Sequence, residues 1–356
     1  MTSERASNVI QISGDVDHEI TPIRAVSSAR GGASASDRDD RWGVILAGGD
    51  GTRLLDLTRL VSGDARPKQF CSFFGEHSLL AQTFQRAGRS IPADRMLIPV
   101  SSAHRNFYLR EPGIRPSQRI VQPSNKGTAP AIVHSLLSIE RHSRDALVAI
   151  LPSDHHYSDE QAFTVTLESA FDAAARHSDS VVLLGSPARS AHVEYGWIEP
   201  GAPLADGSGL LFNVRSFREK PPADLAIQLF EQGALWNTFV MVGRVGAFLE
   251  MVGAARTGLL RAFPPDRLWS GAEVHLPAWL YDRFYAIDFS RDILSLQSQR
   301  LIALKMESTE WNDLGRPERV MDVLHAAGLK PWWMKEWHGA RRLAGVAAPI
   351  SGAAVA

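Results

Sequence analysis

The sequence predicts an α/β fold: a Rossmann-like, doubly wound and mostly parallel sheet with helices on both faces. Two observations support this class. Short apolar runs, typical of strands buried on both faces, alternate with longer stretches of helical period, and a glycine-rich turn directly follows the first apolar run. Repeated strand–helix alternation gives parallel strands joined by right-handed crossovers. The carboxyl ends of such strands share one edge of the sheet, and ligands bind there.

The individual elements are predicted from the same patterns. Strands are predicted over residues 43–47, 96–100, 146–151 and 180–184, and helices over 79–87, 129–141 and 162–177. Residues 1–40 are rich in Ser, Ala, Arg, Asp and Gly and offer little for a core to bury, so this extension is predicted to be disordered.

Composition excludes several classes of function. Hydrophobic residues make up 44% and charged residues 22% of the 356 residues, as in a globular protein with a sizeable core. The 38 basic and 39 acidic residues give a net charge of −1, which provides no global attraction for nucleic acid or an anionic membrane. Any affinity for phosphates must therefore be local.

Cysteine content and hydropathy indicate the compartment. Cys71 is the only cysteine in the sequence, so neither an intrachain disulfide nor a cysteine-based zinc site is expected, and a buried, unreactive thiol is favoured. No apolar run has the length of a membrane span, and the first residues lack the apolar core of a signal peptide. We expect a cytoplasmic protein.

The glycine loop, residues 48–52 (Gly-Gly-Asp-Gly-Thr), follows the first predicted strand. Glycines let the chain turn sharply and expose backbone N–H groups, which can bind phosphate. A P-loop would require Gly-Lys-Ser/Thr at its end, and a dinucleotide fingerprint would require a third glycine where Leu54 stands. The alternative interpretation is that the stretch binds no ligand and is an ordinary tight turn between strand and helix.

Two further polar segments follow predicted strands or begin helices. Gln122 precedes a Gly127-Thr128 turn, and its amide can donate to and accept from a base edge. Asp154 follows the apolar run at 146–151 and would be exposed at the same edge as the glycine loop. The competing interpretations are a well-capped helix start for the first segment and a turn-capping aspartate for the second.

Residues 46–54, Leu-Ala-Gly-Gly-Asp-Gly-Thr-Arg-Leu, with Pro-Lys-Gln-Phe at 67–70, resemble the N-terminal motif of the sugar-phosphate nucleotidyltransferases. Within that family they are most similar to the mannose-1-phosphate guanylyltransferases. Similar motifs continue to about Glu318. The resemblance implies a nucleotidyltransferase domain over residues 41–325, with an inserted β-rich part that binds the sugar.

The resemblance assigns nucleotide-binding, catalytic and metal-binding roles to named residues. The nucleotide-binding positions would be Ala47, Gly48, Gly49, Gly51, Thr52, Gln122, Gly127 and Thr128. Arg53 and Lys68 would be catalytic, with Arg53 at the β- and γ-phosphates and Lys68 at the α-phosphate. Asp154, in Pro-Ser-Asp-His, and Asp313, in Trp-Asn-Asp-Leu-Gly, would hold Mg²⁺.

The sugar phosphate would be bound by a separate set: Gly196, Glu219, Lys220 and Asn237. Gly196 would let the sugar approach the backbone, Glu219 and Asn237 would bind hydroxyls, and Lys220 would neutralise the phosphate. Family members outside the mannose branch often carry a glycine after the Asn-containing motif, where this chain has Thr238-Phe239. No role is transferred to Asp288 or Ser290, because the register of their segment differs.

The implied reaction is GTP plus mannose 1-phosphate giving GDP-mannose and pyrophosphate, with Mg²⁺ as cofactor. The alternatives are a thymidylyl- or uridylyltransferase acting on glucose 1-phosphate, and a non-catalytic sensor or regulatory subunit that binds a sugar nucleotide. A homo-oligomer is possible. Residues 326–356 are predicted to form an aromatic helix or tail, in which Trp332, Trp333 and Trp337 either cover the core of their own domain or anchor a partner.

Overall fold

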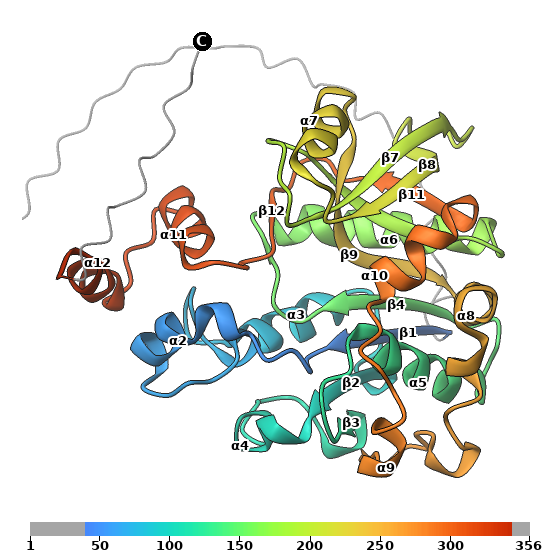
Figure 1. Ribbon diagram of the computed structural model, residues 1–356, viewed down its shortest axis with the longest axis horizontal. Helices are drawn as coiled ribbons and strands as arrows, with labels where there is room; N and C mark the ends of the chain where they lie inside the picture. The colour runs from blue at the N-terminus through green and yellow to red at the C-terminus, as the bar shows by residue number, and fades with distance from the viewer. Residues whose placement is uncertain (1–39, 344–356) are drawn as a thin grey trace, which may run out of the picture.

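The computed structural model describes residues 40–343 and confirms the α/β class (Figure 1). Within these residues, ten strands form one mixed sheet. In spatial order they are β10 (Val274–His275), β3 (Arg119–Gln122), β2 (Met96–Ser101), β1 (Arg41–Leu46), β4 (Leu147–Pro152), β9 (Leu235–Arg244), β6 (Val181–Pro187), β11 (Leu301–Lys305), β8 (Leu211–Glu219) and β7 (Gly196–Pro203). A small second sheet pairs β5 (His156–Tyr157) with β12 (Trp311–Asn312).

The sheet divides into a parallel and a mixed half. Strands β10, β3, β2, β1 and β4 are parallel neighbours, and β1 is aligned with β4 over its whole length. Beyond β4, the strand β9 runs antiparallel to both β4 and β6, and β8 runs antiparallel to β11 and β7. The predicted parallel arrangement therefore applies to the half that carries the glycine loop, while the sheet as a whole is mixed.

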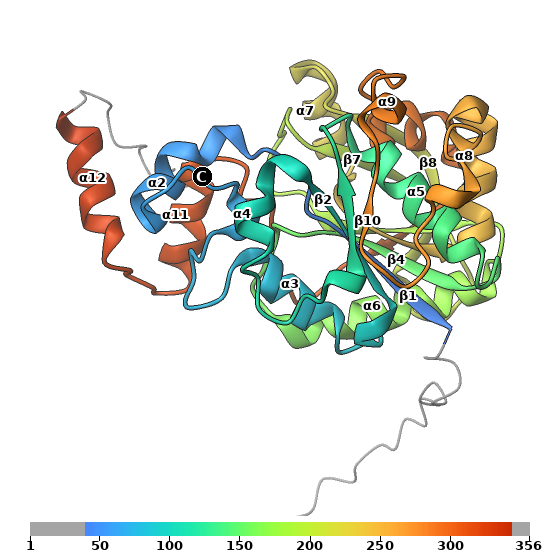
Figure 2. The ribbon, with the colours of Figure 1, turned by 90° about the horizontal axis from the view of Figure 1, so that it is seen from below.

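The helices occupy both faces of the sheet and a separate cluster beside it (Figures 1 and 2). They are α2 (Leu55–Ser62), α3 (Leu79–Ala87), α4 (Arg105–Tyr108), α5 (Thr128–Glu140), α6 (Glu160–Arg176), α7 (Ala223–Glu231), α8 (Val245–Leu260), α9 (Ala278–Tyr281), α10 (Phe289–Asp292), α11 (Pro317–Ala326) and α12 (Trp333–Leu343). Each strand and helix predicted above is present, with ends that differ by at most three residues. The predicted disordered segment lies outside the described residues except for Asp40.

The two faces of the sheet bury two different cores. Along β1, Val44 packs into a core with α5, α8, α9 and α10, whereas Ile45 packs into a core with α3, α6 and α7. Successive strand residues point to opposite faces, so a strand covered on both sides must be apolar at nearly every position. This explains why the predicted strands appear as continuous apolar runs rather than alternating ones.

A third apolar cluster joins segments from both ends of the described chain. Leu57 of α2 and Val320 of α11 pack with Trp333 of α12, and the three helices lie together at one end of the molecule in both ribbon views. Trp333 is buried, whereas Trp332 is 65% exposed. Of the predicted aromatic segment, residues 344–356 lie outside the described residues.

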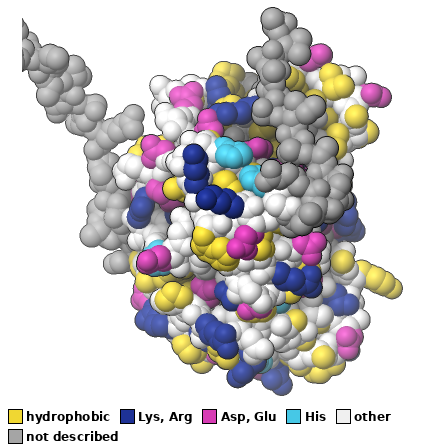
Figure 3. Space-filling view, turned by 90° about the vertical axis from the view of Figure 1, so that its left-hand side faces the viewer, with side chains coloured by type: hydrophobic (Ala, Val, Ile, Leu, Met, Phe, Trp, Pro, Cys, Tyr) yellow, Lys and Arg dark blue, Asp and Glu magenta, His cyan; other side chains and the backbone are white. Residues whose placement is uncertain are grey.

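Charge is dispersed on the face shown in Figure 3, where basic and acidic side chains are interspersed. Within residues 40–343, no helix combines the length and the apolarity that crossing a membrane would require.

His134 makes the fold sensitive to acid. It is fully buried in α5, and burial lowers its pKa to about 4, while its Nε2 lies 2.9 Å from the carbonyl oxygen of Arg267. Because the unfolded chain binds this proton near pH 6.5 and the native protein only near pH 4, the free energy of unfolding falls as pH drops through that window. We expect His134→Gln to make the free energy of unfolding less dependent on pH, lowering its slope against pH by up to about 1.4 kcal/mol per pH unit. Urea unfolding at pH 4.5, 5.5 and 6.5 would measure this slope. An unchanged slope would contradict this.

Candidate active site

The glycine loop lies at the carboxyl edge of the parallel half, between the ends of β1, β3 and β4 (Figure 1). Gly51 has φ 59°, a left-handed conformation, and a Cβ there would lie 3.0 Å from the backbone nitrogen of Lys68. Among the described residues, the backbone N–H groups from Gly49 to Arg53 have no hydrogen-bond partner. The loop therefore presents free donors at the end of a strand, as an anion site requires.

Gln69, which also lines the adjoining pocket, fixes the shape of this loop by two hydrogen bonds. Its amide nitrogen donates to the carbonyl oxygens of Ala47, at 3.0 Å, and Gly49, at 2.7 Å. Ala47 is fully buried and also donates its N–H to Pro99, so it supports the loop and does not line the pocket above it. Gln69 is thus a positioning residue that motif reading passed over, although it stands inside Pro-Lys-Gln-Phe.

Lys68 joins the two predicted metal-binding segments. Its Nζ lies 3.3 Å from Oδ2 of Asp154 and donates to the backbone oxygen of Asp313 at 2.5 Å. The pairing of β12 with β5 brings Asp313 to this edge, because β5 directly follows the Asp154 turn. Lys68 thus links the carboxylate of Asp154 to the backbone of Asp313, two segments that are far apart in sequence.

The carboxylate of Asp313 is strongly held in its charged form. Burial by itself would raise its pKa, but the positive charges of Arg319 and Lys68 outweigh burial and lower the pKa to about 2. Arg319, the hydroxyl of Tyr195 and the N–H of Gly315 all donate to Oδ1. Within residues 40–343, Oδ2 has no hydrogen-bond partner, and it lies beside Gly315, where a Cβ would stand only 2.6 Å from it.

Arg53 contacts a carboxylate rather than standing free. Its side chain is 60% exposed and lies 3.5 Å from Glu194, which also binds Arg316 and Arg319. Arg53, Lys68, Gly51 and Thr52 line one hollow beside the glycine loop. Glu194 was not singled out by the sequence, since its three arginine partners come from distant segments.

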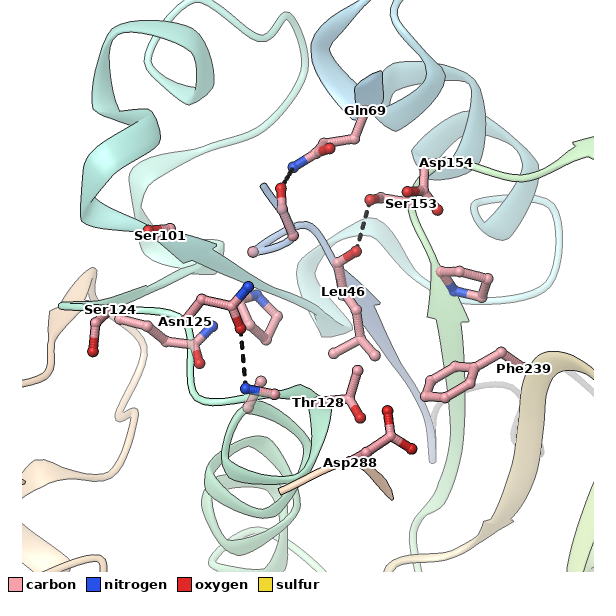
Figure 4. Close-up of a pocket in the computed structure, with 17 residues that line it drawn as sticks. Leu46, Gln69, Ser101, Ser124, Asn125, Thr128, Ser153, Asp154, Phe239 and Asp288 are labelled. Carbon is pink, nitrogen blue, oxygen red and sulfur yellow. Dashed lines mark hydrogen bonds between the residues drawn. The ribbon is translucent and has the colours of Figure 1, made fainter. Parts of the chain in front are cut away.

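An adjoining pocket extends from the glycine loop to the start of α5 (Figure 4). Gly48, Gln122, Gly127 and Thr128 line it, together with Asp154. The Asn125 side chain accepts from the N–H of Gly127 at 3.0 Å and shapes the turn into α5. The structure thus brings the predicted base-binding residues and one predicted metal ligand around a single cavity.

Asp288 and Phe239 also line this pocket, although neither had been assigned a role (Figure 4). Asp288 is the N-cap of α10, where its Oδ1 accepts from the N–H of Arg291. Phe239 has φ 62°. This left-handed conformation costs roughly 1–2 kcal/mol for a side chain other than glycine. Lys220 and Leu314 also have positive φ, so strained backbone gathers around the site, as is frequent at functional positions.

The four predicted sugar-binding residues lie together on neighbouring strands. Gly196 begins β7 and faces Glu219, and a Cβ there would come within 2.7 Å of the Glu219 carboxylate and 3.2 Å of Asn237. Burial raises the pKa of Glu219, although Lys220 lies 3.3 Å away. Asn237 uses its Oδ1 to accept the N–H of Phe239, which leaves its amide nitrogen for a ligand.

Gly127 allows the turn into α5 to pass under the Asp288 segment. Its φ is 83°, and a Cβ would lie 2.3 Å from the carbonyl oxygen of Ile287. We expect Gly127→Ala to lower the free energy of unfolding by about 2 kcal/mol or more and to raise the nucleotide KM at least about tenfold, because both pocket walls must move. Chemical unfolding and steady-state kinetics would measure this. Gly258→Ala, in α8 with open space around it, is the control and should show neither loss.

Comparison with known proteins settles the family. The family described as Nucleotidyl transferase matches residues 42–327, which is most of the chain. The chain belongs to the nucleotidyl transferase family. The match includes the glycine loop, Lys68 and both aspartates, so the family region coincides with the site described above.

Curated relatives of this nucleotidyl transferase share about 30% of its sequence. Xanthan biosynthesis protein XanB of Xanthomonas campestris is 31% identical over 303 residues, covering 80% of this chain and 60% of the relative. Alginate biosynthesis protein AlgA of Pseudomonas aeruginosa is 32% identical over 291 residues, covering 79% and 58%. Mannose-1-phosphate guanylyltransferase of Escherichia coli is 28% identical over 225 residues, covering 62% and 46%. The chain thus spans about half the length of these relatives.

Solved structures share the fold. A protein described as mannose-1-phosphate geranyltransferase from Thermus thermophilus superimposes with a TM-score of 0.65 at 24% identity, covering 78% of this chain and 76% of that one. One described as mannose-6-phosphate isomerase from Helicobacter pylori gives 0.60 at 23% identity, covering 76% and 99%. At these identities the likeness concerns the mixed α/β fold alone.

Proposed function

We propose that this nucleotidyl transferase makes GDP-mannose and pyrophosphate from GTP and mannose 1-phosphate. The observation that carries the proposal is the convergence of Lys68, Asp154 and Asp313 beside the free N–H groups of the glycine loop. The similarity to a mannose-1-phosphate guanylyltransferase supports the choice of substrates. In this reaction, a phosphate oxygen of the sugar phosphate attacks the α-phosphorus of GTP, a new P–O bond forms, and the bond to the β-phosphate breaks.

The residues supply positioning and positive charge rather than a nucleophile. The glycine loop and Arg53 would bind the triphosphate, and Lys68 would stabilise charge that develops at the α-phosphate. Glu219 and Asn237 would bind sugar hydroxyls, and Lys220, which is 61% exposed, can swing toward the sugar's phosphate. Because the attacking oxygen already belongs to a phosphate, no protein base is required to activate it.

The donor set fits a magnesium ion that is shared with the nucleotide. No cluster of three or more His, Cys, Asp or Glu suited to a metal occurs among residues 40–343. Mg²⁺ is commonly held by one or two carboxylates plus substrate phosphates and waters, and Asp154 and Asp313 provide two. When bound, the ion would neutralise phosphate charge. His155 receives a hydrogen bond from Trp311 on Nδ1, and burial lowers its pKa to about 4, so it is a neutral neighbour of Asp154.

One assay tests the proposal. Pyrophosphate release is measured with four nucleoside triphosphates against mannose, glucose and fucose 1-phosphates in the presence of Mg²⁺. We expect the highest kcat/KM for GTP with mannose 1-phosphate. A preference for thymidine or uridine triphosphate with glucose 1-phosphate would replace the proposed substrates. Binding of a sugar nucleotide without release from any pair would identify a sensor instead.

A further inference from the structure

Tyr281 lies behind the base-binding side of the pocket. It ends α9, which follows β10, and β10 extends the sheet beside β3, the strand that ends at Gln122. Tyr281 is fully buried, and its hydroxyl donates to Oε1 of Gln122 at 2.9 Å. Neither the sequence motifs nor the function proposed above assigns this tyrosine a role.

The hydroxyl fixes which end of the Gln122 amide faces the pocket. Within the described residues, the Tyr281 hydroxyl has no other hydrogen-bond partner, and burial raises its pKa, so the phenol keeps its proton. If the amide flipped, its NH₂ group would face the hydroxyl, and the phenolic hydrogen would be buried without an acceptor. An unsatisfied buried donor is costly, so the carbonyl stays toward Tyr281 and the NH₂ group stays toward the pocket.

Gly48 keeps the other end of the amide accessible. The Gln122 nitrogen lies 3.1 Å from where a Cβ on Gly48 would stand, so only glycine leaves that space open. Both residues line the pocket of Figure 4, and this nitrogen has no partner among residues 40–343. The sequence suggests an amide that both donates to and accepts from the base, whereas in the structure its carbonyl oxygen already accepts a hydrogen bond from Tyr281 and its NH₂ group is the end that lies beside Gly48.

We propose that Tyr281 is a specificity-determining positioning residue: by orienting Gln122, it makes the pocket select bases that present a carbonyl oxygen over bases that present an amino group. Guanine, uracil and thymine offer such an acceptor to the NH₂ group, whereas adenine and cytosine place an amino donor at the equivalent ring position. The inference rests on the proposed nucleotide site and adds the chemical rule by which that site would reject ATP.

The test compares size-matched nucleotide pairs, GTP with ATP and UTP with CTP. Dissociation constants are measured by calorimetry, and kcat/KM by pyrophosphate release, for the wild type and for Tyr281→Phe. We expect the wild type to prefer the carbonyl base of each pair. Tyr281→Phe should reduce that preference about five- to a hundredfold, chiefly by better binding of ATP and CTP, with kcat for GTP within about twofold. Damage to the fold alone would weaken both members of a pair together.

Two further variants make the result decisive. Tyr108→Phe is the matched control, because Tyr108 is also buried and its hydroxyl has no partner within residues 40–343; it should leave both ratios unchanged. Gln122→Glu keeps an acceptor for the Tyr281 hydroxyl and turns a second acceptor to the base, so it should shift preference toward ATP and CTP even if Tyr281→Phe does not fold.

Binding separates failure of this inference from failure of the proposed function. A wild type that prefers GTP over ATP in calorimetry but releases no pyrophosphate would remove the proposed reaction and leave the rule for Tyr281 standing. Equal binding of the two members of each pair, binding of neither, an unaltered preference in a folded Tyr281→Phe, or an unaltered preference in Gln122→Glu would overturn the rule.

Discussion

Replacing Asp154 by asparagine is expected to lower kcat by at least about a hundredfold, the scale on which lost transition-state electrostatics acts. Asn keeps the size and one oxygen of the side chain but removes the negative charge that would hold Mg²⁺ against the nucleotide. It also removes the ion pair to Lys68, which lies 3.3 Å away. The half-saturating Mg²⁺ concentration should rise as well, because one of the two proposed carboxylate ligands is lost.

The control lies at the opposite end of the same strand. Asp145 precedes β4, is 84% exposed and stands away from the pocket, so Asp145→Asn should leave both kcat and the Mg²⁺ dependence unchanged. Thermal unfolding of both variants tests whether a loss of rate reflects loss of fold. If Asp154→Asn kept kcat within tenfold of the wild type, Asp154 would be a structural partner of Lys68 and not part of the catalytic set.

The parallel half of the fold could be predicted from sequence because local patterns determine it. A strand covered on both faces shows a continuous apolar run, and the turn after it must contain the residues that its backbone requires. This is why the glycine loop and Asp154 were predicted to share one edge of the sheet. Gln122 joins them through β3, a strand that was not predicted, and these groups line adjoining pockets. The antiparallel position of β9 between β4 and β6 has no such local signal, since pairing partners far apart in sequence decide it.

Positioning residues were harder to predict for the same reason. Tyr281 lies 159 residues from Gln122 in sequence, and Glu194 lies 141 from Arg53. Each acts through a contact that only the folded chain creates, and neither a buried tyrosine nor a half-buried glutamate is a functional signal in isolation. Phe239 is different: the replacement of an expected glycine was visible in the sequence, but its left-handed backbone required the structure.

Lys68→Met is expected to lower kcat by at least about a hundredfold while the nucleotide KM changes much less. Met preserves the length and the apolar stem of the side chain, which is 12% exposed, but removes the ammonium group. That group donates to the backbone of Asp313 and pairs with Asp154. In the proposed reaction it would stabilise the charge that grows on the α-phosphate during transfer. An interaction needed mainly in the transition state affects kcat more than ground-state binding.

Lys68→Arg separates charge from geometry. A guanidinium is planar and larger than an ammonium, and the space between Asp154 and the Asp313 backbone holds Lys68 with contacts of 3.3 and 2.5 Å, so Arg should restore less than a tenth of the lost rate.

Lys305→Met, at an exposed ion pair with Glu307, is the control and should retain full activity. Single-turnover rates distinguish the chemical step from product release. Full rescue by Arg would show that a positive charge is sufficient at this position. Normal single-turnover rates in Lys68→Met would show that Lys68 has only a structural role, that of holding the Asp154 and Asp313 segments together.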